Sequence, residues 1–319
     1  MSKAVIGLDI GTYSVKAVEV SNSHSKKIIA CGYMPLNENE PNIPARIKEL
    51  IVNSGIKSKT AKISVSGKDV IVRYDVFAYM NKDKLLNSLK YDIEKYVPFP
   101  LEDAIIDVNI LGKRPDGQMN VVIVSCSKNF INSQIALLKE TDIELEKIVI
   151  DSSALYNLFY KKTIPSKDKS YIIFRVGHII STVLIVKRGQ IIFSRDVNVG
   201  GDNFTRAIAE FKGLHLPDAS KLKMNPDSDL ENIISIDLNS LINEVEMSIA
   251  YCRKTNVLGD IEMLYLCGGS SKLAQLPKIL QDKLNINCQL WNPFVDLKKT
   301  PILIDYAQEM VLPYGIALA

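Results

Sequence analysis

The sequence lacks the features that mark several large classes of protein. No stretch reaches the roughly 18 to 20 consecutive apolar residues that span a bilayer, and Met1 leads directly into a strand pattern with no signal peptide. Lys and Arg outnumber Asp and Glu by only 39 to 36, far short of the basic excess that nucleic-acid binding requires. We therefore expect a cytoplasmic protein that neither inserts into a membrane nor binds nucleic acid.

Residues that bind metals through sulfur or nitrogen are also scarce. The chain has 5 cysteines and 3 histidines, all widely separated. The cysteines lie mostly in apolar stretches, which is typical of buried, reduced thiols. We expect neither a disulfide framework nor a metal site built from Cys and His.

The N-terminal segment predicts a β-hairpin whose turn is centred on Gly11. Asp9 lies inside the first apolar strand, and a buried carboxylate needs solvent, a cation or hydrogen-bond donors. Gly11 would let the next three amides converge on an anion, and Lys16 would point back as a positive charge. The pattern favours a phosphate-binding turn in which Asp9 holds the water shell of Mg²⁺. A plain tight turn is the alternative.

The middle of the chain repeats this pattern. The segment Leu8–Gly11 matches Phe174–Gly177, and each is followed by a turn and an outgoing strand. Such a duplication is what the two lobes of a cleft would show, and a nucleotide would sit between them. The pairs Gly200-Gly201 and Gly268-Gly269 precede predicted helices, where exposed amides suit an anion or a ribose. A turn that merely requires glycine is again the alternative.

The order of predicted strands and helices favours an α/β fold with more than one unit. An apolar stripe from Leu85 to Val97 predicts a helix that Pro98 ends. The lysine-rich segment 161–170 is the clearest linker. We expect a first lobe from residues 1–79 and 148–168, an inserted α/β subdomain from residues 80–147, and a second lobe from residues 169–319.

The hairpin, its mid-chain counterpart and the late strand that ends in Gly-Gly-Ser-Ser-Lys together resemble the actin-like ATPase superfamily, which has a ribonuclease H-like fold. The segment from Met80 to Lys147 is similar to the extra subdomain of the FtsA branch. Three further segments resemble the PilM family within that branch: Tyr91–Ala104, Val199–Ala209 and the closing Tyr314–Ala319.

The resemblance implies that ATP and Mg²⁺ bind in the cleft, with Asp9 meeting the metal through water. The residues expected at the nucleotide are Gly11, Thr12, Tyr13, Ser14, Lys16, Gly177, Ser181, Thr182, Gly200, Gly201, Lys223, Gly268, Gly269 and Ser270.

Two residues depart from the superfamily pattern. Ser220 stands where a glutamate is expected, and Arg175 replaces the acid of the second phosphate motif. An arginine can strengthen phosphate binding by charge, but it cannot hold a metal or orient a water. Asp151 is then the remaining candidate for a catalytic base, with a helix N-cap as its alternative role. We expect ATP to bind and to be hydrolysed slowly or not at all.

The resemblance also implies a role. PilM-like proteins recruit the cytoplasmic N-terminus of the inner-membrane protein PilN into a groove beside the inserted subdomain. We therefore expect an ATP-binding scaffold of the type IV pilus, or of a related type II secretion system, peripheral to the inner membrane. Its expected partners are a PilN-like protein and other pilus assembly proteins, and a homo-oligomer is compatible with this role. FtsA would add an amphipathic C-terminal helix, whereas this chain stops at Ala319, so attachment should come through the partner.

Two alternatives remain open at this point. A small-molecule kinase on the same fold would need a carboxylate base aimed at a substrate hydroxyl, for which Asp151 is the candidate. An interaction module whose nucleotide site has decayed would explain Arg175 and Ser220.

Overall fold

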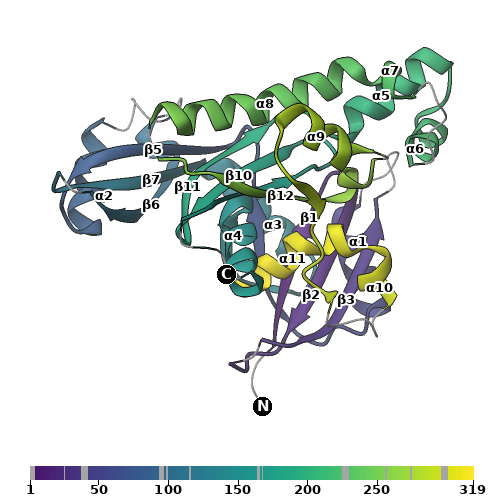
Figure 1. Ribbon diagram of the computed structural model, residues 1–319. Helices are drawn as coiled ribbons and strands as arrows, with labels where there is room; N and C mark the ends of the chain where they lie inside the picture. The colour runs from purple at the N-terminus through teal and green to yellow at the C-terminus, as the bar shows by residue number, and fades with distance from the viewer. Residues whose placement is uncertain are drawn as a thin grey trace.

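The computed structural model describes residues 4–24, 26–36, 42–92, 97, 100–114, 116–163, 166, 168–224, 230–255, 257–273, 275–295 and 301–319. The strands within these ranges form three sheets (Figure 1). The first sheet has the order β3-β2-β1-β4-β8. Its strands are β1 (Val5–Ile10), β2 (Ser14–Val20), β3 (Ile28–Pro35), β4 (Thr60–Val65) and β8 (Glu144–Ile150).

The second sheet repeats the topology of the first. Its order is β11-β10-β9-β12-β13, with β9 (Ser170–Arg175), β10 (Ser181–Lys187), β11 (Gln190–Val197), β12 (Ile261–Cys267) and β13 (Cys288–Leu290). In both sheets, three antiparallel strands joined by hairpins continue into two parallel strands. The predicted duplication is therefore confirmed, with β1 corresponding to β9.

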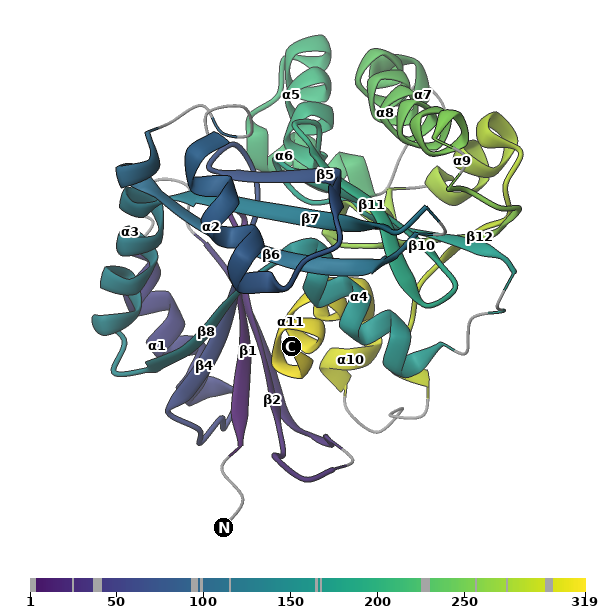
Figure 2. The ribbon, with the colours of Figure 1, turned by 90° about the vertical axis from the view of Figure 1, so that its left-hand side faces the viewer.

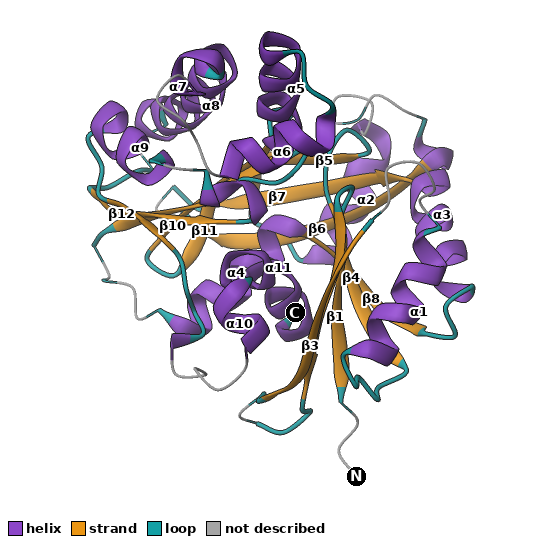
Figure 3. Cartoon of the chain, turned by 90° about the vertical axis from the view of Figure 1, so that its right-hand side faces the viewer, coloured by secondary structure: helices purple, strands orange, loops and turns teal. Residues whose placement is uncertain are grey.

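Helices separate and cover the two sheets (Figure 3). Helices α4 and α11 share one apolar core with strands of both sheets, so they lie between the sheets. Helices α1 and α3 cover the outer face of the first sheet, and α5, α8 and α9 cover that of the second. The helices are α1 (Ile43–Asn53), α3 (Lys128–Lys139), α4 (Asp151–Lys162), α5 (Gly201–Lys212), α6 (Leu216–Met224), α7 (Leu230–Ile233), α8 (Ser235–Lys254), α9 (Leu276–Leu284), α10 (Pro301–Asp305) and α11 (Ala307–Leu318).

Helix α11 lies deep between the lobes because glycines allow close backbone contact. A Cβ on Gly315 would lie 2.2 Å from the backbone oxygen of Ala154 in α4, and a Cβ on Gly7 of β1 would lie 2.0 Å from that of Pro313. Neither distance is sterically allowed, so only glycine permits this packing. Although α11 is mostly apolar after Glu309, no helix in the described ranges is both long and apolar enough to cross a bilayer.

A third sheet and one helix extend from the body of the molecule at the left of Figure 1 and face the viewer in Figure 2, and we call them the insert. The sheet has the order β5-β7-β6. The insert consists of β5 (Val70–Ala78), α2 (Lys82–Asp92), the 3₁₀ turn η2 (Leu101–Asp103), β6 (Ala104–Lys113) and β7 (Gln118–Ser127). Leu85 and Leu89 of α2 pack on Val121 and Ile123 of β7. The end of the predicted helix falls mostly on residues 93–96 and 98–99, which lie outside the described residues. Val97, which was predicted to be in the helix, is described and is not helical.

Sheet membership divides the chain at slightly different residues from the predicted domains. Strand β5 pairs within the insert, although residues up to 79 were assigned to the first lobe. Strand β8 pairs with β4 of the first sheet, although its first residues were assigned to the insert. Local patterns locate a strand but do not identify its partner strand. The domain boundaries themselves stay a prediction.

Candidate functional site

A cavity of about 500 Å³ lies between the β1–β2 hairpin of the first sheet and the β9–β10 hairpin of the second. This volume is typical of a small-molecule site. The rings of Tyr13 and His178, one from each turn, approach to 5.1 Å across it. The predicted site residues that line it are Asp9, Gly11, Thr12, Tyr13, Ser14, Lys16, Asp151, Gly177, Lys223, Gly268, Gly269 and Ser270.

Asp9 and Lys16 form an ion pair across the first hairpin. They are register partners, and Lys16 Nζ lies 2.9 Å from Asp9 Oδ2. Lys16 also donates to the backbone oxygen of Ser14 at 3.3 Å. Both side chains are buried, so the pairing explains how the strand accommodates a carboxylate. Lys16 thus has a fixed position at the wall of the cavity.

Asp9 also offers the acceptor that a hydrated metal would need. Within the described part of the chain, no protein hydrogen bond reaches its second oxygen, Oδ1. Mg²⁺ in nucleotide sites keeps several waters and uses one or two carboxylates together with phosphates. No cluster of three or more His, Cys, Asp or Glu side chains among the described residues could hold a metal alone. Asp9 therefore fits Mg²⁺ that is held jointly with a phosphate ligand.

Arg175 and Asp151 form a second ion pair, which joins the two lobes. Arg175 ends β9, and its Nη1 lies 3.2 Å from Oδ2 of Asp151 in α4. Ser64 Oγ of β4 donates to the other oxygen, Oδ1, at 2.5 Å. The predicted alternative for Asp151 was wrong, because the N-cap of α4 is Ile150 and Asp151 is its first helical residue. Its carboxylate instead pairs with Arg175 and accepts a hydrogen bond from Ser64.

Asp196 is a third acid in this region, and the sequence analysis did not single it out. Its Oδ1 accepts from Thr182 Oγ1 at 2.9 Å, and its Oδ2 accepts from the Gly67 amide at 2.8 Å. Burial raises the pKa of Asp196, and the nearby Asp151 carboxylate raises it further. An acid inside an apolar strand was the signal that identified Asp9, but Asp196 follows Ser194 and Arg195 in β11, so this signal does not mark it.

Four predicted nucleotide contacts do not line the cavity: Ser181, Thr182, Gly200 and Gly201. Ser181 Oγ donates to the Val199 backbone oxygen at 2.6 Å, and Thr182 faces Asp196. The Gly201 amide donates to the Gly177 oxygen at 2.9 Å. These residues hold the second hairpin against the start of α5.

Lys223 of α6 is buried at the wall beside the 3₁₀ turn η3 (Gly269–Lys272). Its Nζ donates to the Gly201 oxygen and to Thr205 Oγ1, each at 2.8 Å. A Cβ on Gly201 would lie 2.0 Å from Ser270 Oγ, so a larger residue there would force the Ser270 side chain to move. Burial lowers the pKa of Lys223 to about 8, although the Asp202 carboxylate raises it in part.

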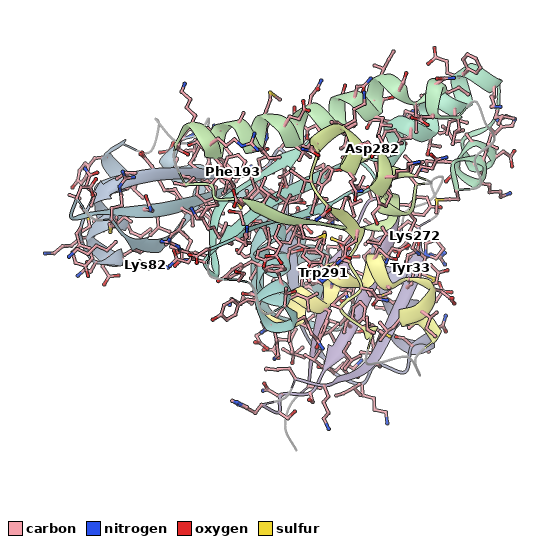
Figure 4. The ribbon with its side chains drawn as sticks, viewed as in Figure 1. Tyr33, Lys82, Phe193, Lys272, Asp282 and Trp291 are labelled. Atoms are coloured by element: carbon pink, nitrogen blue, oxygen red, sulfur yellow. The ribbon has the colours of Figure 1, made fainter. Side chains whose placement is uncertain are left out.

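Another part of the cavity wall was missed by the sequence analysis. Tyr33 of β3 stacks on Tyr306 with ring centroids 4.3 Å apart. Lys272 Nζ lies 2.9 Å from Glu309 Oε1 and 5.3 Å from the Tyr306 ring. Figure 4 labels Lys272 and Tyr33, which both line the cavity. Glu309 Oε2 is buried and has no hydrogen-bond partner among the residues that the structure describes. Burial raises the pKa of Tyr33 to about 12, so its hydroxyl is protonated at neutral pH. No local pattern marks Tyr33, Tyr306 or Glu309, because the fold alone brings them to Lys272, which ends the Gly-Gly-Ser-Ser-Lys segment.

Replacing Lys223 with Met should change how stability depends on pH. From pH 8 to the usual lysine pKa of 10.5, the native state binds fewer protons at this site than the unfolded state. Wild type should therefore gain about 1 kcal/mol of unfolding free energy relative to Lys223→Met between about pH 7 and pH 9. Urea unfolding measures the difference, with Lys221→Met on the exposed side of the same helix as the control. A difference that does not change with pH would contradict the prediction.

Comparisons with known proteins agree with this architecture. A family model for the type IV pilus assembly protein PilM matches residues 7–318. The structure of a PilM-PilN type IV pilus biogenesis complex matches with a TM-score of 0.87 at 23% identity, covering 100% of this chain and 98% of that chain. The ethanolamine utilization protein EutJ from Carboxydothermus hydrogenoformans matches with a TM-score of 0.59 at 13% identity, covering 99% of this chain and 89% of that chain.

MreB 5 of Spiroplasma citri, solved bound to AMPPNP, matches with a TM-score of 0.52 at 12% identity, covering 99% of this chain and 95% of that chain. These structures confirm the two-lobed, actin-like α/β fold that the sequence predicted. The family match extends over nearly the whole chain, and we conclude that the chain belongs to the family of the type IV pilus assembly protein PilM.

Proposed function

We propose that this protein is a cytoplasmic, ATP-binding scaffold of a type IV pilus or related type II secretion system, held at the inner membrane by a PilN-like partner. The observation that carries the nucleotide proposal is the cavity between the two hairpins, which brings Gly11, Lys16 and Gly177 together with Lys223 and Ser270. Backbone amides and a buried cation at one end suit phosphates, and the glycine-rich η3 turn suits a nucleoside.

The roles within this proposal follow the positions of the side chains. Lys16 and the amides of residues 12–14 bind phosphates together with Gly177, and Lys223 and residues 268–270 bind the nucleoside. Asp9 Oδ1 meets Mg²⁺ through water. Gly201 acts through Lys223, because Gly201 itself does not line the cavity. Thr182 donates to Asp196, which does not line the cavity either, so Thr182 supports the second hairpin. Gly200 and Ser181 support the second hairpin in the same indirect way.

Hydrolysis in this proposal is slow or absent. A general base must direct a carboxylate lone pair at water or at a substrate hydroxyl, and each donor that already contacts the carboxylate competes for those lone pairs. Both oxygens of Asp151 are engaged, one by Ser64 and the other by Arg175. The same arrangement disfavours the kinase alternative, which needs Asp151 as its base. Retention of ATP through purification would separate a binding scaffold from a module whose nucleotide site has decayed.

Calorimetric titration with Mg-ATP tests the nucleotide proposal. Wild type should bind, and Lys16→Met should weaken binding about 10- to 100-fold, the usual effect of losing hydrogen bonds to a charged group. Lys48→Met, which removes an exposed lysine of α1, is the matched control and should bind like wild type. If the folded wild-type protein does not bind Mg-ATP, the nucleotide proposal is contradicted.

We place the partner groove where the insert leaves the first lobe. The cavity extends there between β4 and α3, to Val65, Phe130 and Gln134. A peptide at this junction would contact the insert and the nucleotide cavity together. Nucleotide would then affect partner binding if it bound the open and closed lobe arrangements with different affinities.

Truncating Phe130 should weaken partner binding. The experiment measures the affinity of a peptide with the cytoplasmic N-terminal sequence of the PilN-like partner by fluorescence anisotropy. Phe130→Ala should bind the peptide about 10-fold or more weakly than wild type does, which is the usual cost of removing a buried aromatic anchor. Phe211→Ala is the matched control, since Phe211 is 73% exposed on α5, far from the cavity lining. Equal affinity of both variants and wild type would place the groove elsewhere.

A further inference from the structure

We propose that Arg175 supplies the positive charge that a divalent metal otherwise provides at this position, so that the chain binds nucleotide polyphosphates without requiring a divalent metal. The inference rests on the proposed nucleotide site and concerns what that site needs from its ligand. It follows from the place of Arg175 in the sheet, its partner, its remaining hydrogen-bond donors and the charge balance around it.

The backbone of Arg175 is fixed in the middle of the second sheet. Its register partners are Thr182 of β10 and Cys267 of β12, so strands flank it on both sides. Its side chain is 13% exposed and lines the cavity between the hairpins. The guanidinium therefore provides a positive charge at the second hairpin, as the Lys16 ammonium does at the first.

Asp151 holds the guanidinium in place. Arg175 Nη1 lies 3.2 Å from Asp151 Oδ2. Asp151 is itself held by a hydrogen bond from Ser64 and by its position at the start of α4. Burial alone would lower the pKa of Arg175, but the Asp151 and Asp9 carboxylates outweigh burial and raise it. Arg175 is thus a permanent cation in a set position, which lowers the entropy cost of using it to bind a ligand.

Arg175 still has donors available for a phosphate. A guanidinium carries five N–H groups, and the ion pair engages it through Nη1. No hydrogen bond from Nε or Nη2 to the described residues is found, and neither atom is among the buried polar atoms that lack a partner. Arginine forms paired hydrogen bonds with phosphate oxygens. The same side chain can therefore keep Asp151 on one side and bind a phosphate on the other.

The charge balance separates this site from one with an acid at residue 175. Among the charged groups of the two hairpins and α4 that line the cavity, Asp9 is balanced by Lys16, and Asp151 is balanced by Arg175, whereas Asp196 lies outside the lining. An acid at residue 175 would make the same four positions net negative by two charges, which is the charge that one Mg²⁺ offsets. A site that is already balanced does not repel a polyphosphate, so the metal becomes dispensable for binding.

The test is calorimetric titration of the full chain with ATP, once with Mg²⁺ and once with EDTA. Wild type should bind with affinities that agree within about 3-fold. In EDTA, Arg175→Asp should bind ATP about 100-fold or more weakly than wild type does. With Mg²⁺, the affinity of this variant for ATP should recover by at least about 10-fold. Arg175→Lys, which keeps the charge, should stay within about 10-fold of wild type in EDTA.

Arg195→Asp is the matched control, because Arg195 on neighbouring β11 pairs with Glu244 and does not line this cavity. It should bind like wild type in both buffers. Wild-type binding that falls more than about 30-fold in EDTA overturns the inference but leaves the proposed function standing. No binding in either buffer overturns both. If circular dichroism shows that Arg175→Asp does not fold, the wild-type and Arg175→Lys titrations decide the question.

Discussion

The ion pair between Arg175 and Asp151 crosses from the second sheet to helix α4 at the point where the two hairpins converge. Both groups are nearly buried, so each depends on the other: an isolated buried charge is costly, and removing one partner would strand the other. Arg175 lines the cavity and also forms this contact between the lobes, so the relative position of the lobes depends on what binds in the cavity. Anything that binds Arg175 acts on the contact between the lobes.

The rest of the fold supports this contact. Helices α4 and α11 lie between the sheets, and the backbone approaches at Gly7 and Gly315 fix α11 against β1 and α4. Because interiors are close-packed, the lobes cannot slide without breaking these contacts. A change in the angle between the lobes would therefore have to shift the packing of α4 and α11. Such a structure suits binding and signalling of occupancy better than a reaction that needs a free base.

Local sequence signals predicted much of the fold and the wall of the cavity. Asp9 and Gly11 were found because an acid and a glycine interrupt an apolar strand, and the same pattern at Arg175 predicted the duplication that the sheet order confirms. The glycine pair at 268–269 marked the turn after β12 correctly. Each of these patterns can be recognised within a single strand and the turn that follows it, so no knowledge of the tertiary structure is needed.

The remaining features depend on tertiary packing. Strand alternation shows that Ser181 and Thr182 face opposite ways, but not that neither reaches the cavity. The partner of Arg175 comes from a helix of the other lobe, and Tyr33 meets Tyr306 only through the fold. Strand β5 was assigned to the first lobe because a strand pattern does not name its neighbour. The site could therefore be located from sequence, whereas its charge pairing could not.

A crystal structure of the protein grown with ATP tests the central claim most directly. The account predicts polyphosphate density between the turns at residues 11–14 and 177–180, within hydrogen-bonding distance of Lys16 Nζ and of the Arg175 guanidinium, with Asp151 still paired to Arg175. Nucleotide bound elsewhere, or phosphates in the cavity that make no contact with Arg175, would contradict it.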